Sequence, residues 1–288
     1  MALRILDRLF RSKNPGPGMA PILTPEQVAF WENNGYLTLR GFVPPEEIAR
    51  VKEVVDDEWR GDPANDHEVD VNSGPYAGRA YKMREVHPSA RSECYKLNNL
   101  FGRRSEIRQV ALSPRMRAVC AQLLEGEPMI CNSLNFERGS QQEFHIDTWY
   151  MPPPVENCMV VSFIALEDIG PTAGPLKYYP GSHLVPPYRF SHGRLDAVPE
   201  EIPACLNCVR GQLAESDLQG ERFTCKAGDV FLWHAQLFHG GSEIDDRSLT
   251  RRSIVTHYWR AMDVDPSLVA TVGPGRHYLN RPPQVVSY

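Results

Sequence analysis

The sequence lacks the features that would mark a membrane-spanning, secreted or nucleic-acid-binding protein. Its apolar runs fall far short of the roughly 20 residues that a membrane-spanning helix needs. No apolar segment followed by a small-residue cleavage site is present, which argues against secretion. The net charge is −5 at pH 7, and no basic run is interleaved with aromatic residues. We therefore expect no membrane span and no nucleic-acid partner.

Cysteine is scarce and odd in number. The seven cysteines are scattered along the chain. An odd, dispersed set in a chain of this length predicts reduced thiols and a cytoplasmic location. Cys205 and Cys208 have the spacing of a metal knuckle, but no second pair and no nearby paired histidines accompany them. We expect neither a zinc knuckle nor a redox pair there, because the surrounding residues resemble a loop.

The remaining composition predicts one folded domain. The 288 residues are 42% hydrophobic, which is enough for a sizeable core, and they contain no internal repeat. We expect a tail and linker over residues 1–23 and a single domain over residues 24–288. Within the tail, apolar and basic residues alternate over 1–13, which fits an N-terminal helix, a targeting peptide or a frayed end.

The first part of the domain, residues 24–127, carries helical signals. Residues 24–27 read Thr-Pro-Glu-Gln, which is a capped helix start with proline in the first turn. Residues 36–42 alternate like a strand, and a second helix is expected from Pro45. A helix in two pieces is predicted over residues 97–124, with a break near Ser113-Pro114.

From residue 128 onward, short apolar stretches alternate with turns. The predicted strands are 129–138, 142–150, 158–166, 174–179, 222–225, 229–235 and 252–260. This series predicts a mainly β fold with flanking helices, whose core over residues 128–262 is a double-stranded β-helix of the jelly-roll or cupin-like kind. A proline-containing insertion over about 184–221 is expected to form a lid over the mouth of the barrel.

His145 and Asp147 are candidates for a metal site. In a strand, residues two apart point to the same face, so one strand end can deliver an imidazole and a carboxylate to one point. With a distant histidine they would form the two-histidine, one-carboxylate set of a non-haem iron site, which leaves coordination positions open. His234 and His239 both qualify on chemistry as the third ligand. Taken alone, His145 could also be a core histidine bonded to a carbonyl.

At this point the chain resembles the phytanoyl-CoA dioxygenase-like family of Fe(II)/2-oxoglutarate oxygenases over about residues 24–262. The motifs that carry the resemblance are His145-Ile-Asp147, the Gly-Pro-Leu-Lys-Tyr-Tyr-Pro-Gly-Ser-His stretch at 174–183, Gly228-Asp229, His234-x4-His239-Gly240 and Arg251. The resemblance implies that His145, Asp147 and His239 bind iron and that His234 does not. The glycines after His239 are expected to relax the backbone where its strand ends.

The same resemblance implies a site for 2-oxoglutarate. The family anchors its distal carboxylate on an arginine of the strand after the distal histidine, and the spacing favours Arg251 over its neighbour Arg252, which would point to the opposite face. Asn135, Lys96 and Phe163 fall where the family places other cosubstrate contacts. Core packing explains Phe163 equally well, and an exposed helix position explains Lys96 equally well.

The substrate is not identified by the sequence. Trp149, Tyr150 and Tyr178 are candidates for an apolar lining, and Arg189 in the lid is a candidate for holding a carboxylate or phosphate. Core and surface positions are the alternative explanation for all four. Hydroxylation versus desaturation or ring closure, the oxidation site, the pathway and the oligomeric state are also left open.

The predicted function is hydroxylation of an unactivated C–H bond in a small organic molecule, with a lipid-like compound or a secondary metabolite as examples. The resemblance implies Fe(II), 2-oxoglutarate and O₂ as participants, succinate and CO₂ as products, and ascorbate as the reductant used in vitro. The presence of Asp147 favours hydroxylation, because related halogenases have a small residue there. The alternatives are a jelly-roll protein that binds a metal or small ligand without turnover, and a zinc-dependent isomerase.

Overall fold

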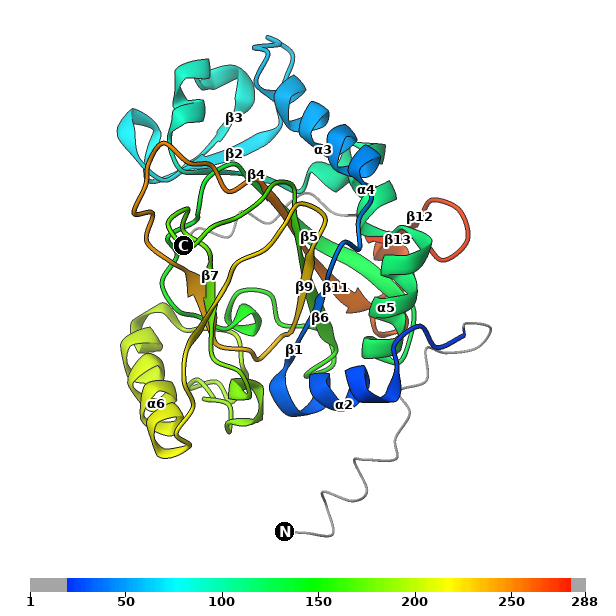
Figure 1. The fold of residues 1–288 in the computed structure, drawn as a ribbon, viewed down its shortest axis with the longest axis vertical. Coiled ribbons are helices and arrows are strands. Elements are labelled where there is room, and N and C mark those ends of the chain that lie inside the picture. The colour runs from blue at the N-terminus through cyan, green and yellow to red at the C-terminus, as the bar shows by residue number, and fades with distance from the viewer. Residues whose placement is uncertain (1–19, 281–288) are drawn as a thin grey trace.

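The computed structural model describes residues 20–280, so the predictions for residues 1–19 lie outside the described part. Helices and a barrel of strands make up this part of the chain (Figure 1). The helices are α2 Pro25–Asn34, α3 Pro45–Glu58, α4 Ser105–Ala111, α5 Pro114–Leu124 and α6 Ile202–Glu215. The strands are β1 Tyr36–Leu39, β2 Glu68–Val71, β3 Ala80–Lys82, β4 Tyr95–Asn98, β5 Pro128–Phe136, β6 Met159–Ala165, β7 Leu176–Tyr178, β8 Glu221–Phe223, β9 Val230–His234, β10 His239–Gly241, β11 Ser253–Arg260, β12 Val269–Thr271 and β13 His277–Leu279.

The strands form two sheets that share one buried core. The larger sheet has the order β1-β9-β6-β11-β5-β4-β2-β3, with β13 beside β5 and β12 beside β13, and the smaller has the order β10-β7-β8. Leu176 and Tyr178 of the smaller sheet are buried in the same cluster as Phe163 and Phe231 of the larger one. This arrangement confirms the predicted double-stranded β-helix.

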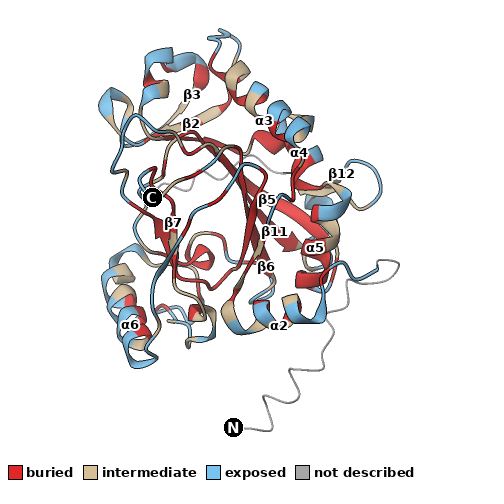
Figure 2. Ribbon diagram, viewed as in Figure 1, coloured by how far each residue is buried: buried red, intermediate tan, exposed pale blue. Residues whose placement is uncertain are grey.

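Helices cover the outer face of the larger sheet. α5 packs against β5, β6 and β11 (Figure 1). In α3 the buried residues Ile48, Val51 and Val55 recur at helical spacing, so one stripe faces the sheet while the other face is exposed (Figure 2). The outward-facing strand residues and these helices form a second hydrophobic core.

Several predicted elements are confirmed. α2 begins with Thr24 as its N-cap, and the capping box with Gln27 is present. The break between α4 and α5 falls at Ser113, as predicted. No helix within residues 20–280 is long and apolar enough to cross a membrane. All seven cysteines lie in this part of the chain as free thiols.

Other predictions were wrong. Leu97 belongs to β4, which pairs with β2 and β5, so the predicted helix over 97–124 starts too early. Residues 142–150 contain no strand. The insertion predicted as a lid, about 184–221, contains α6, because Pro203 occupies a first-turn position where proline favours a helix start. Cys205 and Cys208 therefore lie on a helix.

Candidate metal centre

Backbone hydrogen bonds bring the two ligand segments together. The amide nitrogen of His145 lies 2.8 Å from the carbonyl oxygen of His239, and the reverse pair lies 3.0 Å apart. This isolated bridge replaces the strand predicted over residues 142–150. Ile146 is extended, with φ −121° and ψ 130°, and Asp147 begins a single 3-10 turn. The extended Ile146 places the His145 and Asp147 side chains on one side, as a strand would.

The structure brings the three predicted ligands into one buried cluster. One ligand atom from each of His145, Asp147 and His239 lies within 4.8 Å of the other two. Nε2 of His145 lies 3.5 Å from Oδ1 of Asp147, and Nε2 of His239 lies 3.6 Å from it. The donor set of two imidazoles and one carboxylate suits Fe(II) and similar divalent ions.

The protonation of the cluster also suits a metal ion. Nδ1 of His145 lies 2.8 Å from the carbonyl oxygen of Glu143, and Nδ1 of His239 lies 2.9 Å from that of Leu237. Each Nδ1–H donates to its carbonyl, so each Nε2 keeps its lone pair for the metal. Burial lowers the pKa of His239 to about 4, so this imidazole is neutral at pH 7.

The carboxylate of Asp147 stays ionised despite its burial. Burial by itself raises the pKa of Asp147, but its interactions with His239, His257 and His145 outweigh that effect. The resulting pKa lies well below its ordinary value. Oδ2 of Asp147 also accepts a 2.8 Å hydrogen bond from Nε1 of Trp233.

His234, the competing third ligand, lies outside this cluster. Its Nδ1 accepts a hydrogen bond from the backbone N–H of Gln236 at 3.1 Å. Its ring lies 5.3 Å from the ring of His183 and 6.2 Å from that of Trp31. Of the two chemically suitable histidines, the structure therefore places His239 at the metal cluster.

The two glycines after His239 allow close packing, which corrects the expectation that they relax the backbone. Neither glycine has a positive φ. A Cβ on Gly240 would lie 2.8 Å from the carbonyl oxygen of Gln142, and one on Gly241 would lie 2.4 Å from Oγ of Ser140. The segment that leads into His145 therefore packs directly on the backbone of β10.

We expect Gly241→Ala to disturb the metal cluster. The new methyl group would displace Ser140 and the chain that continues to His145, at a cost of roughly 1–3 kcal/mol in the free energy of unfolding. Thermal unfolding should show a lower unfolding temperature, and Co(II) titration should show weaker metal binding. Gly170→Ala is the matched control, because nothing lies within 4 Å of its Cβ position. Equal behaviour of the two variants would contradict the packing role.

Arg251 is buried beside the metal cluster and has no counter-ion among the described residues. It is 2% exposed, and its guanidinium lies 5.4 Å from the ring centre of Phe136 and 5.3 Å from that of Phe163. Within residues 20–280, its guanidinium makes no hydrogen bond or ion pair. Burial lowers its pKa to about 10, so it remains a cation at pH 7. A buried cation without a partner is a site for an anion.

A narrow slot connects this arginine with the metal cluster. The slot, of about 40 Å³, is lined by Arg251, Phe163, His145, Asp147 and His239, among others. Arg252, in contrast, pairs with Glu137 and lies 3.7 Å from Asp56. The two neighbouring arginines thus face opposite sides, as the alternation of a strand predicts.

Of the other predicted cosubstrate contacts, Phe163 lines the slot and Lys96 does not. Phe163 lies in the slot beside Arg251. Lys96 is a buried residue of β4, which excludes the exposed-helix alternative; its Nζ lies 3.2 Å from Oδ2 of Asp70, and it lines a larger cavity instead of the slot.

The placement of Asn135 is a correction. Asn135 is opposite Leu97 and Ile254 in the sheet, and both of these belong to the outer, helix-facing core. Its neighbours Leu134 and Phe136 line the slot instead. Because side chains alternate along a strand, Asn132 is the asparagine of β5 that faces inward, and it contacts His257. The alternation of β5 could have identified this from the sequence.

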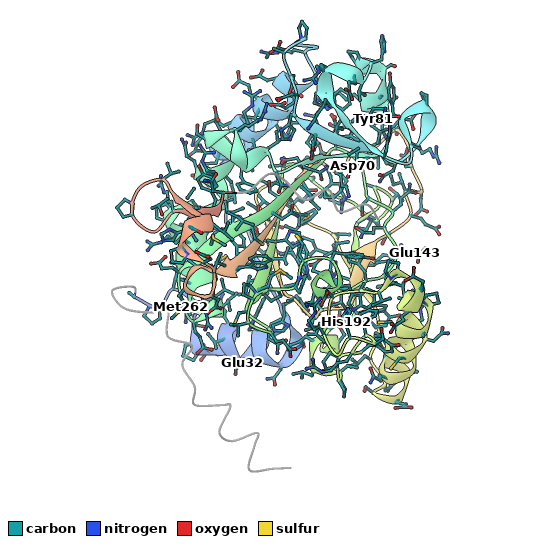
Figure 3. The ribbon with its side chains drawn as sticks, turned by 180° about the vertical axis from the view of Figure 1, so that it is seen from behind. Glu32, Asp70, Tyr81, Glu143, His192 and Met262 are labelled. Carbon is teal, nitrogen blue, oxygen red and sulfur yellow. The ribbon has the colours of Figure 1, made fainter. Side chains whose placement is uncertain are left out.

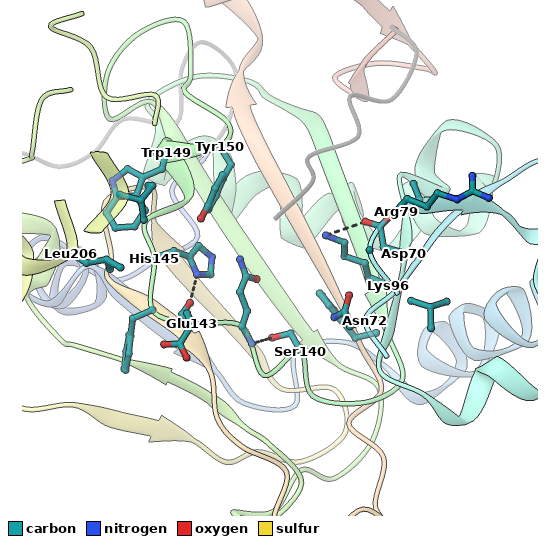
Figure 4. Close-up of a pocket in the computed structure, with 17 residues that line it drawn as sticks. Asp70, Asn72, Arg79, Lys96, Ser140, Glu143, His145, Trp149, Tyr150 and Leu206 are labelled. Atoms are coloured by element: carbon teal, nitrogen blue, oxygen red, sulfur yellow. Dashed lines mark hydrogen bonds and ion pairs between the residues drawn. The ribbon is translucent and has the colours of Figure 1, made fainter. Parts of the chain in front are cut away.

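A cavity of about 510 Å³ opens next to the metal cluster. Figure 4 shows His145, Trp149, Tyr150 and Leu206 on one side of it. The opposite side is polar and is formed by Asp70, Asn72, Arg79 and Lys96. From behind, Asp70 and Tyr81 lie on the β2–β3 part and Glu143 lies nearer α6 (Figure 3).

Two of the four candidate substrate residues line this cavity. They are Trp149 and Tyr150. Tyr178 is instead a core residue whose hydroxyl lies 2.8 Å from Oε2 of Glu221. Arg189 is exposed, pairs with Glu156 at 2.9 Å and lines neither cavity. Of residues 184–221, only Ile202 and Leu206 of α6 line this cavity. The sequence could not show this, because it did not predict the helix.

The family is shown by sequence comparison. A profile described as "Phytanoyl-CoA dioxygenase (PhyH)" matches residues 31–252, which contain the metal cluster and Arg251. The chain belongs to this family. Membership in the phytanoyl-CoA dioxygenase family agrees with the resemblance seen in the motifs. No curated protein matches the chain at a significant level.

Solved structures of similar fold include non-haem enzymes that depend on α-ketoglutarate. The α-ketoglutarate-dependent carbocyclase SnoK from nogalamycin biosynthesis has a TM-score of 0.63 at 17% identity, with 85% of this chain and 87% of that chain covered. EctD from S. alaskensis has a TM-score of 0.62 at 18% identity, with 89% and 84% covered. The epimerase SnoN, also from nogalamycin biosynthesis, has a TM-score of 0.60 at 18% identity, with 89% and 98% covered. These likenesses show that the chain shares the fold of these proteins.

Proposed function

We propose that this protein is an Fe(II)- and 2-oxoglutarate-dependent dioxygenase that hydroxylates an unactivated C–H bond of a small organic substrate. The observation that carries the proposal is the slot that joins a His-Asp-His cluster to the guanidinium of Arg251, which has no partner within residues 20–280. A protein that only binds metal has no need of a buried cation there. EctD, one of the structures of similar fold, has been crystallised with iron and with 2-oxoglutarate.

Each part of the site has a task in this proposal. His145, Asp147 and His239 would hold Fe(II), which when bound supplies the oxidising chemistry through its open positions. Arg251 would pair with the distal carboxylate of 2-oxoglutarate through two parallel N–H donors. Phe163 and other apolar residues of the slot keep water from that ion pair, which strengthens it.

The 510 Å³ cavity is the proposed substrate site. Its volume is in the range of cavities that take small organic ligands. One side offers Trp149 and Leu206, and the other offers Asn72 and Lys96. This division favours a substrate with an apolar body and hydrogen-bonding groups at one end. His145 lies at the edge of the cavity, so a bound substrate would reach the metal cluster.

We expect Leu206→Trp to separate substrate binding from cosubstrate binding. Leu206 lines the large cavity and is absent from the slot lining, so a larger side chain would fill the first without changing the second. Substrate-stimulated succinate release should fall about 10-fold or more, while the 2-oxoglutarate Kd should change less than about 2-fold. A parallel loss of 2-oxoglutarate binding would contradict this division of the two cavities.

The test of the function is succinate release from 2-oxoglutarate under air with Fe(II) and ascorbate, followed by a substrate screen with the same readout. Anaerobic binding of 2-oxoglutarate should produce a weak visible charge-transfer band. The absence of both signals would favour a non-catalytic binding protein. Turnover of a substrate without O₂ would favour a zinc-dependent isomerase.

A further inference from the structure

A fourth histidine, His257 on β11, lies against the metal cluster. It is 2% exposed, and its Nε2 lies 3.6 Å from Oδ1 of Asp147, the same distance as Nε2 of His239. It is nevertheless not one of the three residues whose ligand atoms lie within 4.8 Å of one another. His257 therefore contacts the carboxylate without completing the ligand set.

Asn132 selects the tautomer of this histidine. Nδ2 of Asn132 lies 3.3 Å from Nδ1 of His257, and the two residues are opposite each other on β5 and β11. An amide nitrogen can only donate, so Nδ1 accepts and Nε2 carries the proton. His257 can therefore point an N–H at Oδ1 of Asp147, whereas His145 and His239 cannot, because their protons lie on Nδ1.

The sheet is distorted where this contact is made. The register between β11 and β5 shifts directly after His257, between His257 and Tyr258. Such bulges are frequent beside active sites, where they re-aim a side chain. Tyr258, on the far side of the shift, points outward and contacts the carbonyl oxygen of Ala111 at 2.8 Å.

The other oxygen of the same carboxylate is held as well. Nε1 of Trp233 on β9 donates to Oδ2 of Asp147 at 2.8 Å. Each carboxylate oxygen thus faces a ring N–H from a different strand, while Oδ1 also faces His145 and His239. Held in this way, the carboxylate offers one oxygen to a metal. A carboxylate that turned to offer both oxygens would occupy an additional coordination position.

We propose that His257, oriented by Asn132, is a positioning residue that keeps the Asp147 carboxylate in a one-oxygen orientation and so keeps coordination positions free. The inference rests on the proposed function only in that a divalent metal occupies the site of His145, Asp147 and His239. Partners of metal ligands typically contribute 10–100-fold to metal affinity or activity. His257 would therefore influence the metal without binding it.

The test is Co(II) titration of the full chain, followed by visible absorption. We expect His257→Leu to weaken Co(II) binding about 10–100-fold. The d–d bands should also lose intensity, because the freed carboxylate raises the coordination number. His257→Gln keeps an N–H donor of similar reach and should recover the affinity to within about 3-fold of the wild type. Thr256→Val, one residue away and buried on the outer face, is the matched control and should not change either signal.

A second variant covers the case in which His257→Leu does not fold. Asn132→Leu leaves the imidazole in place but removes the group that selects its tautomer, and should weaken Co(II) binding by at least about 3-fold. Unchanged affinity and spectrum in His257→Leu, or in Asn132→Leu where the first does not fold, would overturn the proposal. Loss of all Co(II) binding in both the Leu and Gln variants would also overturn it, by making His257 a ligand.

These outcomes are separate from those of the oxygenase proposal. A wild-type protein that binds Co(II) with the expected variant effects, but does not bind 2-oxoglutarate, would contradict the oxygenase function and leave the role of His257 standing. A protein that binds 2-oxoglutarate and releases succinate, but whose Co(II) affinity and spectrum do not change on substitution of His257, would support the oxygenase function and contradict the role of His257.

Discussion

Arg251→Met is expected to abolish tight binding of 2-oxoglutarate and, at the same time, to stabilise the protein without ligand. Arg251 is 2% exposed, and its guanidinium has no counter-ion within residues 20–280. The cost of burying this charge is therefore not offset until an anion binds. Loss of one member of a buried charge pair costs about 2–5 kcal/mol, which is roughly 30-fold to 4000-fold in Kd. Removing an unpaired buried charge should raise the unfolding temperature of the ligand-free protein.

Arg252→Met is the matched control, because the two arginines are adjacent and face opposite sides. Arg252 pairs with Glu137, so its loss should lower the unfolding temperature and leave the 2-oxoglutarate Kd within about 3-fold. Arg251→Lys should give an intermediate Kd, because lysine cannot pair both carboxylate oxygens. Anaerobic titration of the charge-transfer band measures the Kd, and calorimetry measures the stability. Equal effects of the two methionine variants on the Kd would refute the assignment of Arg251.

Asp147→Ala is expected to abolish metal retention. Asp147 supplies the only carboxylate among the three clustered ligand residues and is in contact with both histidines. Without it, two neutral imidazoles remain, and the affinity for Fe(II) should fall by more than about 1000-fold, beyond the 10–100-fold that loss of an outer partner costs. Fe(II) or Co(II) titration, followed by measurement of succinate release, checks this result.

Histidine variants serve as controls for the ligand assignment. His145→Ala should behave like Asp147→Ala. His234→Ala should keep its metal, because the side chain of His234 lies outside the cluster. Full metal occupancy in His239→Ala would refute the choice of His239 as the third ligand.

Local patterns predicted much of the fold because they depend on short-range geometry. The capping box of α2 and the helical spacing of buried residues in α3 each involve neighbours within one or two turns. The failures lie where a local signal was ambiguous. The prolines of residues 184–221 by themselves predict a loop, although one of them, Pro203, starts α6. The apolar stretch at 142–150 predicts a strand, but it forms only an isolated bridge to β10 at His145 and then a 3-10 turn over Asp147–Trp149.

The pairing of His145 with Asp147 followed from local spacing, since residues two apart in an extended chain share a face. His239 and Arg251 followed from the resemblance to the motifs of the family. The partners across the barrel did not follow, because strand pairing between distant segments depends on registers that no local pattern encodes. The pairing of β5 with β11 sets Asn132 opposite His257. In the same way, the pairing of β2 with β4 puts Lys96 beside Asp70 at the wall of the large cavity. The sequence thus identifies the metal ligands and Arg251. The residues that orient these side chains and the shape of the adjacent cavity depend on packing between remote strands.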